Sequence, residues 1–459
     1  MATTVIILAA GQGKRMRSAH PKVLQPLGGE PLLAHVLAAA RALRPRELRV
    51  VHGHGGEAVQ AAFAGQPVAW FHQAEQRGTG HAVRQGLPGL PADDVALILY
   101  GDVPLIRAET LRRLVARARR GELALLTAEF ADPKGYGRIL RGERGRITGI
   151  VEEKDATPDQ RRLREGNTGL LACPASHLAR WIRRLKANNA QGEYYLTDIV
   201  GLAAKEGVPV AGILAPDVEE VFGVNDRRQL AEAERILQRR RAGELLDAGV
   251  TLADPGHLIV RGRVRCGRDV FIDAGVILEG DVTLGDGVRI GPWSLVRDAT
   301  LGAGTVVHSH SVIEAGRIGE GCEIGPYARV RPDVELADGA KLGNFVEIKK
   351  SVIGRGSKVN HLTYIGDATI GAAVNVGAGT ITCNYDGANK HRTVIGDGAF
   401  IGSGVELVAP VEIGAGATIG AGSTITKAAP AGALTVARAR QATIPGWQRP
   451  VKAKKGAGH

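Results

Sequence analysis

The stretch IGEGCEIGPYARVRPDVELADGAKLGNFVEI, residues 318–348, carries an aliphatic residue at every sixth position. The series slips by one residue at Ile353, recovers, and continues to Ile425. Its members are Ile318, Ile324, Val330, Leu336, Leu342, Ile348, Ile353, Val359, Ile365, Ile395, Ile401, Leu407, Ile413, Ile419 and Ile425. A helix repeats every 3.6 residues and a strand every two, so neither explains a period of six. This period is typical of a parallel β-helix, in which each hexad forms a short strand and a turn.

The same period begins earlier, at Leu278, Leu284, Ile290 and Val296. We therefore expect the β-helix to span residues 251–437. One insertion, Cys383–Arg392 (CNYDGANKHR), interrupts the period within the repeat region. An interruption in so strict a repeat predicts a functional role, and we expect this segment to leave the β-helix as an arm with Asn384 and Tyr385 at its base.

The bulk composition indicates a multidomain protein with anionic ligands. The chain has 459 residues, too many for one ordinary domain, and a formal net charge of +12. Phosphates or coenzyme A fit this charge better than nucleic acid, because no basic run is interleaved with aromatic residues. Four scattered cysteines predict neither a disulfide framework nor a zinc knuckle. The chain enters an apolar run at its N-terminus and has no apolar run of 18 residues, so we expect a cytoplasmic protein without membrane insertion.

The first half of the chain alternates apolar runs with helical patterns, which predicts a doubly wound, Rossmann-like α/β domain. Ligands bind such domains at the carboxyl ends of the strands, where the polar residues of interest fall. The predicted strands are Thr4–Ala9, Leu48–His52, Val68–His72, Val95–Tyr100 and Ala124–Glu129, and the predicted helices include Pro31–Leu43 and Ala108–Arg120.

Three polar segments follow these strands. The Gly11–Met16 loop lacks the third glycine of a dinucleotide fingerprint, so it is either a tight turn or a phosphate cradle with Arg15 and Lys22 as cations. The Gln73–His81 segment is either an ordinary helix start or a binding loop for a base or phosphate. Asp102 directly follows a buried strand and is either a turn residue or a ligand of Mg²⁺ on a nucleotide.

Together these segments resemble the nucleotidyltransferase family that makes nucleotide sugars. The family pattern L-A-A-G-x-G-x-R-M followed by a lysine is matched by Leu8–Met16 and Lys22, with Lys14 standing where a small hydroxyl residue is more usual. The resemblance implies that Arg15 and Lys22 are catalytic and that Asp102 and Asn225 coordinate Mg²⁺. The residues it implies for binding UTP and the sugar nucleotide are Leu8, Ala9, Ala10, Gly11, Gly13, Lys22, Gln73, Gly78, Thr79, Tyr100, Gly101, Asp102, Gly137, Glu152, Asn167 and Asn225.

A helical pattern over Asp226–Ala248 predicts a connecting helix, capped by Asp226 and ended by Gly249. Its apolar residues Leu230, Ala233, Ile236, Leu237, Leu245 and Leu246 lie roughly on one face. The Arg239–Arg241 run is interpreted as a solvated helix face rather than an anion site.

In the second half, His361 lies outside the aliphatic columns and is interpreted as a general base. The alternative is a zinc site formed by His361 with His308 and His310. These two histidines lie about three coils before His361, so we consider the zinc site unfavourable. Arg331, Lys349 and Lys350 are candidates for holding a sugar phosphate. The candidates for hydrogen bonds to an amine and an acyl oxygen are Tyr364, Asn375 and Asn384.

The run Val374–Gly387, with Gly343–Lys350 and the Trp447–Lys452 tail, resembles the bifunctional bacterial family that makes UDP-N-acetylglucosamine. The resemblance implies a left-handed β-helix with three hexads per coil, assembled as a homotrimer. It also implies acetylation of glucosamine 1-phosphate by acetyl-CoA, followed by UMP transfer from UTP to give a cell-wall precursor. The implied coenzyme A contacts are Ala378, Asn384, Tyr385, Ser403, Ala421 and Arg438; Arg331, Lys349, Tyr364 and Asn375 would bind glucosamine 1-phosphate.

The implied organisation is a uridylyltransferase domain at 1–227, a linker helix at 228–250, an acetyltransferase β-helix at 251–437 and a tail at 438–459. Cys383 is interpreted as a bystander, because the resemblance implies direct acetyl transfer. One alternative is a sugar nucleotidyltransferase with a single activity and a structural β-helix. Another is an assembly subunit with an inert first domain, which would be expected to lack Arg15, Lys22 or Asp102. We expect an acetyltransferase pocket walled by more than one subunit.

Overall fold

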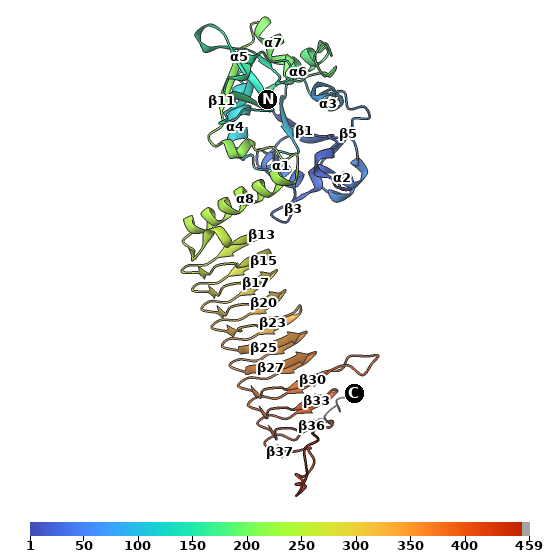
Figure 1. Ribbon diagram of the computed structural model, residues 1–459, viewed down its shortest axis with the longest axis vertical. Coiled ribbons are helices and arrows are strands. Elements are labelled where there is room, and N and C mark those ends of the chain that lie inside the picture. Colours follow the sequence, from blue (N-terminus) through green and yellow to red (C-terminus); the bar gives the residue numbers. More distant parts are fainter. Residues whose placement is uncertain (452–459) are drawn as a thin grey trace, which may run out of the picture. The chain divides into compact units, whose positions relative to one another are not determined.

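The computed structural model describes residues 1–451 and forms two compact units, Met1–Gly243 and the residues from Glu244 onward (Figure 1). The basic segment Lys452–His459, whose role the sequence leaves open, lies outside the described residues. Each unit has its own sheet and its own core.

The first unit is built on a twisted sheet in the order β11-β7-β10-β6-β1-β4-β5. β10 runs antiparallel to both of its neighbours, and the other pairings along this path are parallel. A short flap, β8 and β9, extends from β10. The strands are β1 (Thr3–Ala9), β4 (Glu47–His52), β5 (Ala69–His72), β6 (Val95–Tyr100), β7 (Leu123–Glu129), β8 (Gly137–Arg141), β9 (Ile147–Val151), β10 (Glu165–Pro174) and β11 (Val210–Leu214), with a separate hairpin of β2 (Pro26–Leu27) and β3 (Glu30–Pro31).

Helices cover both faces of this sheet, which confirms the predicted doubly wound α/β domain. One core cluster packs α1 and α4 against the sheet, and the other packs α3, α6 and α7 against its opposite face. Strand residues such as Ile6 and Ile7 alternate between the two clusters because successive side chains leave a strand on opposite faces. The helices are α1 (Leu32–Arg41), α2 (Gly56–Ala62), α3 (Thr79–Gln85), α4 (Ala108–Ala118), α5 (Pro158–Arg161), α6 (Ala175–Ile182) and α7 (Asp198–Lys205).

The register of the central strands brings the predicted site segments together. β1 pairs in parallel with both β4 and β6, so that Leu8 lies opposite Tyr100 and Ala9 opposite His52. The loops that follow these strands therefore leave the sheet at the same edge.

The predicted connecting helix is α8 (Arg227–Asp247). Asp226 Oδ1 accepts hydrogen bonds from the backbone N–H groups of Arg228 and Gln229, both at 2.9 Å, and Gly249 follows the helix at φ 89°. The expected apolar face is confirmed for Ala233 and Ile236 but not for Leu246, which is 45% exposed.

The interpretation of Arg239–Arg241 as a solvated face holds for Arg239, which is exposed, but is wrong for Arg240. Arg239 pairs with Glu219, and Arg240 donates to Asp217 at 2.9 Å and to the Leu105 carbonyl at 2.8 Å. Arg241 donates to the Gly28 carbonyl. These partners lie on segments distant in sequence, so a helical pattern alone cannot reveal them.

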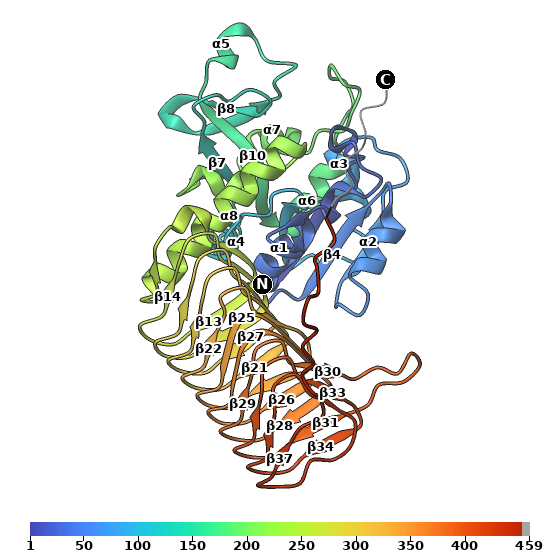
Figure 2. The ribbon, with the colours of Figure 1, turned by 60° about the horizontal axis from the view of Figure 1, so that its bottom comes forward.

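The second unit is a parallel β-helix in which each strand pairs with the strand one coil further on, as both views of the stacked coils show (Figures 1 and 2). Its strands form three faces. The first face contains β12 (Thr251–Leu252), β14 (Phe271–Ile272), β16 (Arg289–Ile290), β19 (Val306–Val307), β22 (Glu323–Ile324), β29 (Asn375–Val376), β32 (Phe400–Ile401), β35 (Thr418–Ile419) and β37 (Leu434–Thr435).

The second face contains β17 (Leu295–Arg297), β20 (Val312–Glu314), β23 (Arg329–Val330), β30 (Ile381–Cys383), β33 (Glu406–Val408) and β36 (Thr424–Ile425). The third contains β18 (Thr300–Leu301), β21 (Gly316–Ile318), β24 (Val334–Leu336), β26 (Ser351–Ile353), β28 (Ala368–Ile370), β31 (Thr393–Ile395) and β34 (Val411–Ile413). Four long strands pass from one face to the next: β13 (Ile259–Cys266), β15 (Ile277–Leu284), β25 (Lys341–Lys349) and β27 (Lys358–Gly366).

The aliphatic residues of the six-residue series fill the axis, and each of them is at most 4% exposed. The same columns contain residues that the six-residue series omits, among them Leu301, Val307, Ile313, Ile370, Val376 and Thr382. Thr382 is tolerated at the axis because its hydroxyl accepts a hydrogen bond from the Gly366 N–H at 2.7 Å.

We call the turn from the first face to the second the first corner, and the turn from the second face to the third the second corner. The first corner places large residues in left-handed backbone conformation on five successive coils, a set we call the corner ladder. Its members are Trp293, His310, Tyr327, Phe345 and Leu362, with φ between 48° and 60°. His310 stacks on Tyr327 with ring centroids 4.9 Å apart, and Tyr327 stacks on Phe345 at 5.3 Å.

The inserted segment leaves the coil at the second corner, between β30 and β31, and projects from the stack as an arm (Figure 1). A bridge between Tyr385 and Lys390 closes it as a hairpin. Asp386 accepts hydrogen bonds from the N–H groups of Ala388 and Asn389, which shapes its tip.

Candidate active sites

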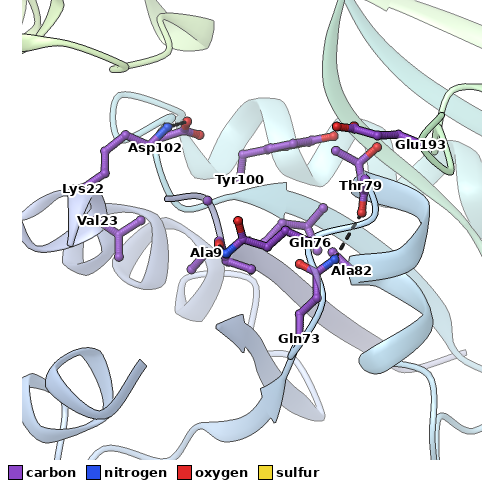
Figure 3. A pocket seen from close by; sticks show the side chains of 14 residues that line it. Ala9, Lys22, Val23, Gln73, Gln76, Thr79, Ala82, Tyr100, Asp102 and Glu193 are labelled. Atoms are coloured by element: carbon purple, nitrogen blue, oxygen red, sulfur yellow. Dashed lines mark hydrogen bonds and ion pairs between the residues drawn. The ribbon is translucent and has the colours of Figure 1, made fainter. Parts of the chain in front are cut away.

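The first unit contains a cavity of about 240 Å³ at the carboxyl ends of β1 and β6 (Figure 3). Lys22 and Asp102 lie on one side of it, and Tyr100, Thr79 and Glu193 gather on the other. The cavity is lined by Leu8, Ala9, Ala10, Gly11, Lys22, Val23, Gln73, Gln76, Gly78, Thr79, Ala82, Tyr100, Asp102 and Glu193.

Gly13 allows the loop after β1 to approach Lys22 closely. Gly13 has φ 60°, and a Cβ at this position would lie 2.8 Å from the Cβ of Lys22. The close approach of the loop to Lys22 therefore requires glycine. The Lys22 ammonium donates to Asp102 Oδ2 and, at 3.1 Å, to Asn225 Oδ1, so two oxygens from distant segments converge on one positive charge.

The Gln73–His81 segment forms the opposite wall. Gly78 adopts φ 101° and passes so close to Tyr194 that a Cβ would lie 2.7 Å from its carbonyl oxygen. Gln73 Nε2 donates to the Gly78 carbonyl at 3.3 Å, and Gln76 Nε2 donates to the Ala10 carbonyl at 2.9 Å. The Gln76 bond ties the segment to the loop after β1, and the Gln73 bond holds the segment together at the cavity.

The residues implied for sugar binding lie beyond Tyr100. A Cβ at Gly169 would lie 2.6 Å from the Tyr100 ring, and a Cβ at Gly137 would lie 3.3 Å from Glu152 Oε2. Burial raises the pKa of Glu152, and the nearby carboxylates Asp198 and Asp155 raise it further, against a 2.9 Å hydrogen bond from Thr197. Burial also raises the pKa of Tyr100, with smaller contributions from Glu152 and Asp102.

Most of the residues predicted for UTP line this cavity, but the set is divided. Those outside the lining are Gly13, Gly101, Gly137, Glu152, Asn167 and Asn225. The predicted catalytic residue Arg15 is also outside it and is exposed on a short 3₁₀ turn. The lining residues that sequence reasoning missed are Val23, Gln76, Ala82 and Glu193. Gln76 and Ala82 lie within or next to a segment already singled out, whereas nothing local marks Glu193.

In the second unit the first corner gathers residues that are far apart in sequence. Asn344 and His361 are register partners on β25 and β27. The column continues coil by coil through three backbone hydrogen bonds. The N–H groups of Gly379, Gly404 and Gly422 donate to the carbonyls of His361, Ala378 and Ser403, respectively. Its members, in order, are Asn344, His361, Ala378, Ser403 and Ala421, and Arg438 ends it by donating to the Ala421 carbonyl at 2.7 Å.

The second corner carries the cations. Arg331 donates to Glu347 at 2.8 Å, and Lys349 lies close to Lys390 of the arm. The proximity of Lys390, and then of Arg331 and Lys350, lowers the pKa of Lys349. Mutual repulsion of this kind marks a place where an anion would be stabilised.

Tyr364 and Asn384 meet above Gly366 at the same corner. A Cβ at Gly366 would lie 2.5 Å from the Tyr364 hydroxyl and 2.7 Å from the Asn384 amide nitrogen, so a side chain there would displace both polar groups. The Asn384 amide donates to Asp367 Oδ2, which fixes its orientation at the base of the arm. The Tyr385 hydroxyl donates to the Gly387 carbonyl and the side chain is 59% exposed.

The predicted acetyltransferase residues thus occupy different corners of one chain. His361 lies at the first corner and Lys349 at the second, on adjacent coils at opposite ends of the second face. Lys349 lies five positions further along β25 than Asn344, a distance of up to about 16 Å. Asn375 lies on the first face and is not brought to Tyr364.

No group of three or more His, Cys, Asp or Glu side chains within residues 1–451 is arranged to hold a metal, and His310 stacks on Tyr327 instead. Burial, together with Glu406, raises the pKa of Cys383, which disfavours a thiolate nucleophile. Among the same residues, no helix is long and apolar enough to cross a bilayer.

Comparisons with known proteins match both units. Residues 5–195 match the MobA-like NTP transferase domain, and residues 263–298, 315–350 and 392–427 match the bacterial transferase hexapeptide repeats. Proteins named bifunctional protein GlmU are similar over almost the whole chain. The one from Alkalilimnicola ehrlichii is 59% identical, covering 98% of this chain and 97% of the relative; that from Aromatoleum aromaticum is 60% identical, covering 98% and 99%. The chain therefore belongs to the family of bifunctional GlmU proteins, as an enzyme that joins a nucleotidyltransferase domain to a hexapeptide acetyltransferase domain.

Proposed function

We propose that the second unit acetylates glucosamine 1-phosphate with acetyl-CoA, and that the first unit transfers UMP from UTP to the product, giving UDP-N-acetylglucosamine and pyrophosphate. The observation that carries the first step is the column at the first corner. It joins His361 to Ala378, Ser403, Ala421 and Arg438, a line along which an extended acyl carrier can lie.

In the acetyl transfer, His361 takes a proton from the sugar amine as the amine nitrogen attacks the thioester carbonyl. The new N–C bond forms, the C–S bond breaks, and coenzyme A leaves as a thiol. Arg331 and Lys349 hold the sugar phosphate, and Tyr364 and Asn375 position the ring. Asn384 and the Ala378 backbone stabilise the acyl oxygen.

In the uridylyl transfer, the sugar phosphate attacks the α-phosphate of UTP and pyrophosphate leaves. Gln73, Gly78 and Thr79 hold the base, while Glu152 and Asn167 bind the sugar. Lys22 and Arg15 offset the negative charge that grows on the phosphates. This is catalysis by positioning and electrostatics, since the chain contributes no covalent intermediate.

Asp102 and Asn225 would hold Mg²⁺ in this reaction. Their oxygens converge on the Lys22 ammonium, so the pair already accommodates a positive charge, and carboxylate and amide oxygens suit a hard cation. When bound, Mg²⁺ neutralises charge on the triphosphate.

We also propose that the chain forms a homotrimer whose acetyltransferase pocket is walled by more than one copy. His361 lies at the first corner, Lys349 lies at the second corner, and Asn375 lies on the first face. A second copy is therefore needed to close a pocket around all of them. The corner ladder supports this assembly. Tyr327, Phe345 and Leu362 are 49%, 55% and 62% exposed, although a left-handed non-glycine residue costs about 1–2 kcal/mol.

We also propose a cytoplasmic location. All four cysteines are free thiols, which fits a reducing compartment.

The single-activity alternative is disfavoured, because a purely structural β-helix needs neither the column around His361 nor the paired cations at the second corner. A domain arrangement of 1–227, 228–250, 251–437 and 438–459 remains our proposal for how these functions divide the chain.

One reaction mixture tests the whole proposal. The chain is incubated with glucosamine 1-phosphate, acetyl-CoA, UTP and Mg²⁺, and free thiol and pyrophosphate are followed in time. Thiol release should precede pyrophosphate release, and omission of acetyl-CoA should prevent both. Pyrophosphate release from glucosamine 1-phosphate alone would contradict the proposed order.

A further inference from the structure

We propose that Asn344 is a positioning residue that fixes the proton on His361 for acetyl transfer. This inference rests on the proposed role of His361 as the general base. His361 Nδ1 lies 2.8 Å from Asn344 Oδ1, and the two residues are register partners on adjacent coils. Sequence reasoning assigned no role to Asn344.

The chemistry of the contact sets the tautomer. An amide oxygen can only accept a hydrogen bond, so Nδ1 of His361 carries the hydrogen and donates it. Nε2 is then left with a free lone pair, and it is the atom that can take a proton from the sugar amine. In the other tautomer Nε2 would carry a hydrogen and could not act as the base.

The backbone makes this arrangement rigid. Phe345 and Leu362 follow the two residues in left-handed conformation, so both side chains leave the corner from equivalent backbone. Phe345 stacks on Tyr327, which secures the coil of Asn344. The His361 carbonyl accepts from the Thr363 hydroxyl at 2.6 Å and from the Gly379 N–H at 3.2 Å, which secures the coil of His361.

An amide is a neutral partner, and it holds the ring without stabilising the imidazolium as a carboxylate would. The next coil faces His361 with Gly377, Ala378 and Gly379, which have no titratable side chain. On β25 and β27 the carboxylate of Glu347 is paired with Arg331, and the lysine Lys341 is paired with Glu323. The remaining titratable side chains of these two strands are Lys349, Lys358 and Tyr364.

The test compares full-length Asn344→Ala, Asn344→Asp, His361→Ala and the double variant His361→Ala/Asn344→Ala in acetyl-transfer assays across pH. We expect Asn344→Ala to lower kcat about tenfold, with KM for both substrates little changed. In Asn344→Asp the carboxylate favours the imidazolium, so the acidic limb of the pH profile should move up by about one unit. The double variant should be no slower than His361→Ala, because Asn344 acts only through His361.

Asn360→Ala, which removes the adjacent asparagine at the same corner, is the matched control and should leave the rate and the pH profile unchanged. Circular dichroism and thermal unfolding of each variant report whether the β-helix is folded, and uridylyl transfer reports on the first unit. A further loss in the double variant, or an Asn344→Asp profile lowered equally at every pH, would show that Asn344 is merely structural. If His361→Ala itself retains acetyl transfer, the proposed function of this site fails, and the inference fails with it.

Discussion

The cavity of the first unit and the corners of the second assemble their residues in different ways. In the α/β unit, parallel strands end at one edge, so loops distant in sequence converge on a single enclosed cavity within one chain. In the β-helix, equivalent positions stack into columns on an outer surface, and the cations and His361 stand at different corners. A coil aligns residues along its axis on an outer surface, which is why we propose that another copy completes the second site.

The largest expected effect separates the two regions outright. His361→Ala should lower acetyl transfer by about 10²–10⁴-fold, the usual contribution of a general base. Uridylyl transfer from ready-made N-acetylglucosamine 1-phosphate should continue at the normal rate. His308→Ala, three coils earlier, is the control and should change neither rate. Parallel loss of both activities would mean that the two regions do not work as separate sites.

Asp102→Ala should have the reverse effect. Removing a proposed Mg²⁺ ligand at the end of β6 should lower uridylyl transfer by about 10²–10³-fold, because charge on the phosphates is no longer offset. Acetyl transfer should persist. Asp93→Ala changes an exposed aspartate before the other end of the same strand and serves as the control. A variant at Asp102 that keeps its rate and its Mg²⁺ dependence would remove this residue as a ligand.

Gly13→Ala tests how the cavity holds its cation. The added Cβ would lie 2.8 Å from that of Lys22, so the lysine must move away from Asp102 and Asn225. A displacement near 1 Å should reduce uridylyl transfer about 10-fold to 10²-fold. Gly149→Ala, where a Cβ meets nothing within 4 Å, controls for the loss of a glycine in the same unit. An unchanged rate would show that the position of Lys22 is unimportant.

The smallest expected effect is a pH dependence of sugar binding. The pKa of Glu152 is raised by burial, so as pH falls this carboxylate becomes protonated earlier than an ordinary glutamate with a pKa of about 4.3. The KM for the sugar phosphate in uridylyl transfer should therefore rise on the acidic side, by about tenfold for the lost charged hydrogen bond. Glu152→Gln should show a KM that is high and independent of pH in this range. A wild-type KM that stays constant there would contradict a role for the carboxylate.

The sequence predicts the framework of both units because the forces that form it act at short range. A buried axis demands an aliphatic residue in each hexad, and a buried parallel strand demands an apolar run such as Val95–Tyr100. The series omits Ile370, Val376 and Thr382 because the step from Ile365 to Ile370 is five residues rather than six, and because a hydroxyl takes the place of a methyl group at Thr382.

The sites are less predictable, because their residues meet through tertiary contacts. The separation between Ala378 and Ser403 includes the arm, so spacing alone hides their position in one column with His361. Glu193 lines the nucleotide cavity from a loop with no motif of its own. The partners of Arg240 lie more than one element away, and a helical pattern therefore suggests exposure where the side chain is bound.

Mixed assemblies test the shared site most directly. His361→Ala and Lys349→Ala chains, each inactive in acetyl transfer, are co-expressed with different tags, and the assemblies that carry both tags are purified. If one copy supplies the first corner and its neighbour the second, each mixed trimer contains one intact site among its three, so about a third of the wild-type activity should return. Mixtures no more active than the separate variants would show that His361 and Lys349 act from the same chain, which would contradict the account.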